Sequence, residues 1–262
     1  MQILTRSVAA SVILNNKRNT ELNRVNTDLS SSSVHETYKL VFDMTEGSMD
    51  ASVIRIKDSK DFHAISNVGD TSFGIHDVDE RILAYIINEK SIRNRQLKKK
   101  HISLLESGSA YDLETVNAYA NLIKNIKQNI IENGAVTVDL SYIDEVKNLE
   151  ELDHKSNSQN ELLIDKNIIY DRLCKDIYDW SLAHIEKAIT QADVNDRDVD
   201  EIIIIGEKYK MPGFYEYLRH AYPFKRISYV KEEDLAIGAS IVGRKLKYQE
   251  IKITEVLCRR YS

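Results

Sequence analysis

The sequence is poor in glycine and proline. It has 9 glycines and 2 prolines among 262 residues, whereas an average chain of this length has about 18 and about 13. Loops that cradle phosphate depend on glycine, because their backbone N–H groups must approach the ligand with no side chain between. A nucleotide enzyme with this composition would have little material for such loops.

Other absences exclude further classes of protein. The two cysteines, Cys174 and Cys258, lie far apart and form no ligand pair, which indicates a reducing compartment and a cytoplasmic protein. The seven histidines show no metal-ligand spacing, so no metal site is predicted. No apolar run approaches the roughly 18 residues that span a bilayer, and Met1–Leu14 has no small-residue cleavage signal. We therefore expect no membrane contact and no secretory leader. The net charge of -5 gives no reason to expect specific nucleic-acid binding.

The chain does contain clear strand signals. Three short β-like runs separated by turn residues predict an antiparallel meander, at Tyr38–Phe42, Ala51–Ile56 and Phe62–Ile65. Ile202–Ile205 is an uninterrupted β-branched run, which predicts a central strand covered on both faces. Further strands are predicted at Ala135–Leu140, Leu162–Asp165 and Arg226–Tyr229.

Helical spacing predicts helices between these strands. They are expected at Thr5–Leu14, Asp77–Asn88, Leu113–Ile131, Asn167–Ala192, Pro212–Ala221 and Glu232–Leu246. Asp77 is expected as an N-cap, and Pro212 at a first helical position, where its missing N–H costs nothing. The polar stretch Asn15–Val34 has no sustained period and is predicted to be a loop. The order of elements indicates a mixed α/β protein.

Four segments in sequence order resemble the second lobe of the nucleotide-binding domain of 70-kDa heat-shock (DnaK-like) chaperones. They are Phe42–Asp50, Gly69–Asp79, Ile204–Pro212 and Glu232–Ala239. They are similar, in order, to that family's second phosphate loop, its glycine-aspartate-threonine segment, its adenosine loop and its final helix. Val8–Val12 also resembles the alanine-rich helix that enters the lobe, so the likeness covers nearly the whole chain.

This resemblance implies an actin-like ATPase (ribonuclease H-like) lobe, with a β-meander sheet flanked by helices. Residues 1–80 and 166–248 would form the core of the lobe. Residues 81–165 would form a smaller inserted α+β subdomain. Residues 249–262 would be a linker-like tail, because Ile251–Leu257 loosely resembles the family's interdomain linker and the first strand of its substrate-binding domain.

The resemblance also implies a vestigial nucleotide site. Its expected residues are Asp43, Gly47, Ser48, Lys127, Gly206 and Glu232. Asp43 would bind a magnesium-bound water, or would be only an acidic residue at the end of a strand. Gly206 is interpreted as a requirement of the strand-to-helix turn. Asp70 and Asp77 are interpreted as capping residues, with a place in the nucleotide site as the alternative.

The departures from the family pattern decide the expected function. Thr45 and Glu46 stand where the family has glycines. A carboxylate about 4 Å from one phosphate charge costs about 4 kcal/mol at an effective dielectric near 20. Glu207 replaces the second glycine of the adenosine loop, and Tyr209 follows it. The family's glutamate-proline switch dipeptide corresponds to Thr5-Arg6.

The sequence therefore predicts a catalytically silent chaperone-family module that acts in protein folding through protein–protein contacts. No cofactor is expected, and ATP or ADP with magnesium would bind only if the site survived in a longer chain. The family's first lobe is absent, and phosphoryl transfer needs both lobes to position its reactants. One alternative is an excised lobe of a longer ATP-binding chaperone, which the linker-like end favours. Another is an actin-like phosphotransferase, against which the lost glycines argue.

One local concentration of charge stands out. The run Arg93–His101 is basic, and a solvated helix face is its default interpretation. The alternatives are contact with ribosomal RNA or with an acidic partner. In the family, exchange factors dock on the second lobe's edge subdomain. We accordingly expect protein partners, such as a chaperone cofactor or a ribosome-associated factor, on the region Ile82–Asp165.

Overall fold

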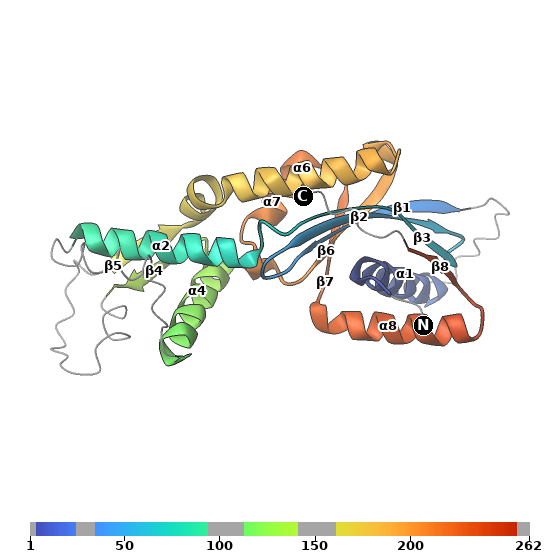
Figure 1. Ribbon diagram of the computed structural model, residues 1–262, viewed down its shortest axis with the longest axis horizontal. Coiled ribbons are helices and arrows are strands. Elements are labelled where there is room, and N and C mark those ends of the chain that lie inside the picture. The colour runs from blue at the N-terminus through green and yellow to red at the C-terminus, as the bar shows by residue number, and fades with distance from the viewer. Residues whose placement is uncertain (1–3, 25–34, 94–112, 141–160, 256–262) are drawn as a thin grey trace. The chain divides into compact units, whose positions relative to one another are not determined.

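The computed structural model describes residues 4–24, 35–93, 113–140 and 161–255. The chain divides into two compact units (Figure 1). Unit 1 consists of residues 1–75, 177–207 and 215–262, and unit 2 of residues 76–176 and 208–214. The insertion expected at residues 81–165 lies within unit 2, which also includes residues 76–80, 166–176 and 208–214.

A six-stranded sheet forms the centre of unit 1. Its order is β7 (Arg226–Val230), β6 (Val199–Ile205), β1 (Glu36–Met44), β2 (Met49–Lys57), β3 (Asp61–Asp70) and β8 (Lys252–Thr254). Strands β1, β2 and β3 form the predicted antiparallel meander. Strand β6 is parallel to both its neighbours, β1 and β7. The isoleucine run is thus an interior strand, as its β-branched composition predicts.

Helices cover both faces of this sheet. Helices α1 (Arg6–Arg24) and α8 (Glu232–Lys247) lie on one face, and α6 (Lys175–Gln191) lies on the other (Figure 1). On the α1 side, the two helices and the strands share one cluster of buried hydrophobic residues. It includes Val8, Val12, Val41, Ile54, Ile203 and Val242. Burying each such side chain fully contributes roughly 1.5–3 kcal/mol. On the α6 side, Ser66 Oγ donates to the carbonyl oxygen of Ala188 at 2.7 Å.

Helix α1 is longer than its apolar pattern indicates. It continues to Arg24, so the prediction of a loop from Asn15 is wrong for residues 15–24; residues 25–34 lie outside the described residues. The polar half is held by charge pairs that a periodicity argument does not detect. Arg18 Nη2 lies 2.6 Å from Glu201 Oε1 of β6, and Lys17 Nζ lies 3.6 Å from Asp234 Oδ2 of α8.

Two predicted helix starts also differ. The helix expected over Asn167–Ala192 is divided into a π-helical turn, η2 (Ile168–Leu173), and α6. Helix α7 (Phe214–Ala221) begins after Pro212, because Gly213 has a φ of 91° and interrupts helical geometry. Asp77 lies in the first turn of α2 (Ile75–Arg93) and is therefore not its N-cap.

Unit 2 is an α+β arrangement. It contains most of α2, α4 (Leu113–Asn133), the antiparallel pair β4 (Ala135–Asp139) and β5 (Glu161–Asp165), and the short turn η4 (Lys208–Lys210). Lys90 Nζ donates to the Leu140 carbonyl oxygen at 2.7 Å and so joins α2 to the end of β4. This agrees with the strands and helices predicted from the sequence in this region.

Candidate functional site

The loop between β1 and β2 is the segment that resembles a phosphate loop, and it is a closed turn. The Thr45 N–H donates to the Ser48 carbonyl oxygen at 2.8 Å, and the two hydroxyl oxygens lie 2.8 Å apart. Gly74 packs closely against this turn, since a Cβ there would lie 2.3 Å from the Glu46 carbonyl oxygen. The Ile75 N–H also donates to the Thr45 carbonyl oxygen at 2.9 Å. The loop is therefore bound to its own unit by backbone contacts.

Asp43, at the end of β1, is engaged by an arginine of α1. Arg6 Nε donates to Asp43 Oδ2 at 2.6 Å, and Arg6 Nη2 donates to Asp43 Oδ1 at 3.0 Å. The Asp43 side chain is only 8% exposed. Arg6 Nη2 also lies 3.7 Å from Glu232 Oε1, at the first residue of α8. The structure thus brings Asp43 and Glu232 together, around a cation that belongs to the chain itself.

The residue before Arg6 has its own distant partner. The Thr5 N–H donates to Glu255 Oε1 at 3.0 Å, and its hydroxyl donates to Glu255 Oε2 at 2.9 Å. Glu255 directly follows β8, and its carboxylate accepts the N–H of the residue just before α1. Thr5 and Arg6 together connect the start of α1 to the residue after the edge strand β8 and to the interior strand β1.

This arrangement does not fit a magnesium ion at Asp43. A hard divalent cation needs carboxylate oxygens as ligands, but both Asp43 oxygens accept hydrogen bonds from a guanidinium. An ion beside them would also face the positive charge of Arg6. Within the described part of the chain, no group of three or more His, Cys, Asp or Glu residues could hold a metal ion.

The other expected site residues have separate surroundings. Lys127, on α4 of unit 2, is buried and forms an ion pair with Asp79 of α2. Gly206 follows β6 with a φ of 114°, and its N–H donates to the Val230 carbonyl oxygen at 2.8 Å. That conformation disfavours any residue with a Cβ.

Tyr209 fills part of the segment that resembles the adenosine loop. Its ring lies in η4, and the Lys124 ammonium of α4 is 5.8 Å from the ring centroid. A cation at this distance from an aromatic face is attracted to it, by about 0.5–1 kcal/mol at an exposed site. Both residues belong to unit 2. An aromatic side chain therefore stands two positions after Glu207, which is the residue that replaces a glycine of the adenosine loop in the resemblance.

Asp70 has the capping role that the sequence indicates. Its Oδ1 accepts a hydrogen bond from the Ser72 N–H at 2.6 Å, as in an Asx turn. Burial alone would raise the pKa of Asp70, but the hydrogen bonds from Ser72 and the nearby His184 and Trp180 lower it. Asp70 is thus held as a carboxylate by its turn.

A second group of charges is buried in the sheet of unit 1. Glu201 of β6 is 1% exposed, and its Oε1 accepts a hydrogen bond from Ser228 Oγ at 2.6 Å in addition to the Arg18 contact. Lys39 Nζ of β1 lies 3.6 Å from Glu201 Oε2. Burial lowers the pKa of the Lys39 ammonium, while Glu201 acts to raise it. This cluster is a structural pairing of buried charges.

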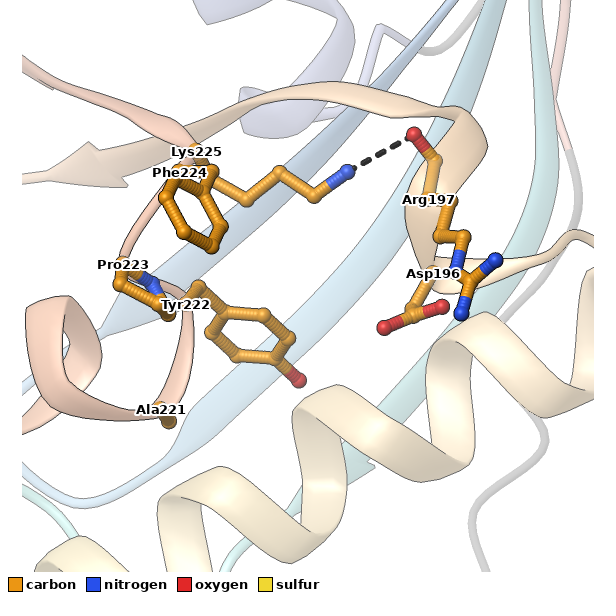
Figure 2. Close-up of a pocket in the computed structure, with 7 residues that line it drawn as sticks. All are labelled: Asp196, Arg197, Ala221, Tyr222, Pro223, Phe224 and Lys225. Carbon is orange, nitrogen blue, oxygen red and sulfur yellow. Dashed lines mark hydrogen bonds between the residues drawn. The ribbon is translucent and has the colours of Figure 1, made fainter.

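Unit 1 also has a surface pocket, of about 440 Å³, between η3 (Asp196–Asp198) and the turn after α7. Figure 2 shows the rings of Tyr222 and Phe224 on one side and the side chains of Asp196 and Arg197 on the other. Lys225 Nζ donates to the Arg197 carbonyl oxygen at 2.9 Å. Burial raises the pKa of Tyr222 to about 12, so its hydroxyl remains protonated at neutral pH. Phe224 is 98% exposed.

Sequence reasoning noted Thr5-Arg6 only as a departure and missed its contacts. A signal was present for Arg6, because a basic residue stands where the related pattern has proline and an acidic site lies nearby. No local signal could have found Glu255, which is 250 positions from Thr5.

The fold and the position of these residues define a class. A mixed sheet with an antiparallel meander, helices on both faces and a phosphate-type loop after the first strand is an actin-like ATPase lobe. A family model described as Hsp70 protein matches residues 28–259, and the chain belongs to the Hsp70 family. Among the described residues, no helix is both long and apolar enough to cross a membrane.

Three relatives illustrate the distance within the family. The chaperone protein dnaK of Thalassiosira pseudonana is 23% identical over 205 residues, covering 77% of this chain and 30% of that protein. Chaperone protein DnaK of Thermosipho melanesiensis is 23% identical over 218 residues, with 80% and 32% covered. Chaperone protein dnaK of Cyanidioschyzon merolae is 24% identical over 204 residues, with 77% and 30% covered. The chain spans about a third of the length of these relatives.

Proposed function

We propose that this chain is a catalytically silent Hsp70-family module that acts in protein folding, in the cytoplasm, through contacts with other proteins. The observation that carries the proposal is the placement of Tyr209 against Lys124, in the segment that resembles the adenosine loop. A nucleoside would have to displace this side chain before it could approach the backbone.

The phosphate-loop segment supports the same proposal. Glu46 adds a negative charge to it, and the loop is closed by the Thr45–Ser48 hydrogen bonds. A polyphosphate would meet like charge, and the Thr45 N–H of this loop already donates to the Ser48 carbonyl oxygen. Neither feature prevents folding, because Glu46 is exposed and the hydrogen bonds of the loop lie within unit 1. A scaffold that is intact while its ligand groups are replaced suits protein contacts better than phosphoryl transfer.

A calorimetric titration of the full chain with ATP and ADP, each with Mg²⁺, tests the silent half of the proposal. We expect no binding tighter than about 1 μM, which corresponds to about -8 kcal/mol, and no phosphate release above buffer. Binding tighter than this, or steady-state turnover, would contradict it. Tyr209→Gly is the informative companion, since tighter nucleotide binding by this variant alone would identify Tyr209 as the blocking group.

The contact half of the proposal places a partner surface on the region Ile82–Asp165. Its basic run Lys98–Lys100 lies outside the described residues and enters here by its charge alone. Reversal of these three charges should weaken partner capture from native cells and leave the melting temperature unchanged, because isolated surface charges contribute little to folding. Recovery of the same partners by both proteins would remove the basic run from the proposal. Recovery of none by either would count against the contact role itself.

A further inference from the structure

We infer that Arg6 is a built-in cation that occupies the carboxylate pair Asp43–Glu232, and that Thr5-Arg6 acts as a latch. The latch fastens the loop after β1 and the C-terminal strand β8 to the start of α1 without any bound ligand. The inference deepens the proposed function, and it rests on that proposal for the statement that no nucleotide competes for Asp43. Its own support is the geometry of five polar contacts on two adjacent residues.

The first half of the latch is the Arg6–Asp43 pair. Its two hydrogen bonds of 2.6 and 3.0 Å are the parallel, bidentate geometry that a guanidinium forms with a carboxylate. Because Asp43 is buried, its charge needs a partner, and removal of that partner leaves a carboxylate poorly solvated. The Arg6 side chain is 44% exposed, so the guanidinium lies at the protein surface and is not part of the core.

Glu232 extends the pair to a second helix. It is the first residue of α8, whose first turn also contains Glu233 and Asp234. Arg6 Nη2 lies 3.7 Å from Glu232 Oε1, which is an ion-pair distance without a hydrogen bond. One cation therefore faces two carboxylates from β1 and α8, as a divalent ion would. Without Arg6, these two carboxylates would lose the one guanidinium that faces both of them.

The second half of the latch is Thr5. Its backbone N–H and hydroxyl both donate to the carboxylate of Glu255. Glu255 directly follows β8, and β8 pairs in parallel with β3 at Asp61–His63. Strand β8 has only three residues, so its own ladder gives it few hydrogen bonds. The Thr5–Glu255 contacts hold the residue that directly follows β8.

The two halves are coupled because they are neighbours on one turn of chain. The position of Thr5 depends on where α1 begins, and Arg6 fixes that start against β1. Loss of Arg6 should therefore loosen both the loop and β8, although the ion-pair partners of Arg6 are Asp43 and Glu232 and lie outside β8. A purely local ion pair would loosen only the loop.

Hydrogen exchange on the full chain tests this coupling, comparing the wild type with Arg6→Ala. We expect at least tenfold faster exchange in both Thr45–Ser48 and Lys252–Thr254. Lys17→Ala is the matched control, because it removes another ion pair from α1 and should change neither segment. Unchanged exchange at β8 in Arg6→Ala, or equal acceleration in the control, would overturn the latch. If Arg6→Ala does not fold, Asp43→Asn removes the charge pair with a smaller change in shape and is held to the same outcomes.

A titration with Mn²⁺ alone tests whether Arg6 occupies a cation position. We expect Arg6→Ala to bind Mn²⁺ at least tenfold more tightly than the wild type, and the added substitution Asp43→Asn to abolish the gain. Equal Mn²⁺ affinity in the wild type and Arg6→Ala would overturn this assignment. Nucleotide binding by the wild type would instead contradict the proposed function, while the exchange data would still decide the latch.

Discussion

Gly238 of α8 lies directly against the carbonyl oxygen of Ala9 in α1, where a Cβ would be only 2.6 Å from that oxygen. Ile13 is nearly as close, with its Cδ1 at 2.8 Å from the same position. Such distances do not occur between real Cβ atoms and their neighbours, so the two helices can approach this closely only at a glycine. This contact sets the spacing of the helical layer on the Arg6 side of the sheet.

We predict that Gly238→Ala destabilises unit 1 by about 1–3 kcal/mol, because the new methyl group meets backbone that cannot move away without separating the helices. Gly243→Ala, in the same helix, is the control. Nothing lies within 4 Å of its added Cβ, so the higher helix propensity of alanine should stabilise the protein by up to about 1 kcal/mol. Denaturant unfolding measures both. Equal effects of the two substitutions would show that helix propensity, and not the Ala9 contact, governs this helix.

A second pair of glycines tests how the loop after β1 is packed. Gly74→Ala should cost about 1–3 kcal/mol, because its Cβ would meet the Glu46 carbonyl oxygen at 2.3 Å. Gly47→Ala should be nearly neutral, since its Cβ would lie in open space. Thermal unfolding of the two variants gives the comparison. A large loss from Gly47→Ala would mean that this loop has a different conformation in solution.

Five strands of unit 1, β1, β2, β3, β6 and β7, could be predicted from the sequence because their signals are local. The isoleucine run at Ile202–Ile205 and the turn-bounded runs of the meander each contain the apolar, β-branched pattern that indicates a buried strand. The second half of α1 could not be predicted in this way. Its polar residues are held by partners such as Glu201, more than 180 positions away, and no window of adjacent residues contains that information.

The candidate site, too, could be predicted from the sequence only in part. Asp43, Gly47 and Glu232 were predicted by resemblance, and the first and last do lie around one point. The resemblance could not predict that Arg6 would lie between them, because the family pattern has no cation there. Strand β8 lies in the segment that the resemblance assigns to a linker and to the first strand of another domain. Its pairing with β3 could not be predicted, since three residues are too few for a periodic signal and their partner strand lies about 190 positions earlier.

The Glu201 cluster predicts a strong and pH-dependent loss of stability. Glu201→Ala should cost about 3–5 kcal/mol, because it leaves the buried Lys39 ammonium without its counter-ion. Burial lowers the pKa of Lys39 in the folded state. The unfolded chain therefore binds more protons between that lowered pKa and about 10.4, so this group's contribution to stability rises with pH in that window.

Denaturant unfolding of Glu201→Ala at neutral and mildly alkaline pH measures this dependence. We expect the deficit relative to the wild type to shrink as the pH rises and Lys39 loses its proton. The double variant Lys39→Met with Glu201→Ala should be more stable than Glu201→Ala alone, since no unpaired charge remains. A deficit that is independent of pH and of Lys39 would assign the loss to packing alone.

The last prediction concerns Phe224, whose ring is almost fully exposed beside the pocket of unit 1. Because this ring is exposed, it contributes little buried area to the fold. Phe224→Ser should therefore change the free energy of unfolding by no more than about 0.5 kcal/mol. Exposed aromatic side chains are enriched at protein interfaces, where they bury large areas. If the chain acts through protein contacts, this ring is a candidate anchor, and Phe224→Ser should reduce recovery of partners that the wild type captures. Ile237→Ser, on the outer face of α8, is the matched control, because that side chain is also exposed but lies away from the pocket. Quantitative affinity capture of the three proteins from native cells makes the comparison. A loss common to both variants would indicate general surface hydrophobicity, and no loss in either would exclude Phe224 as an anchor.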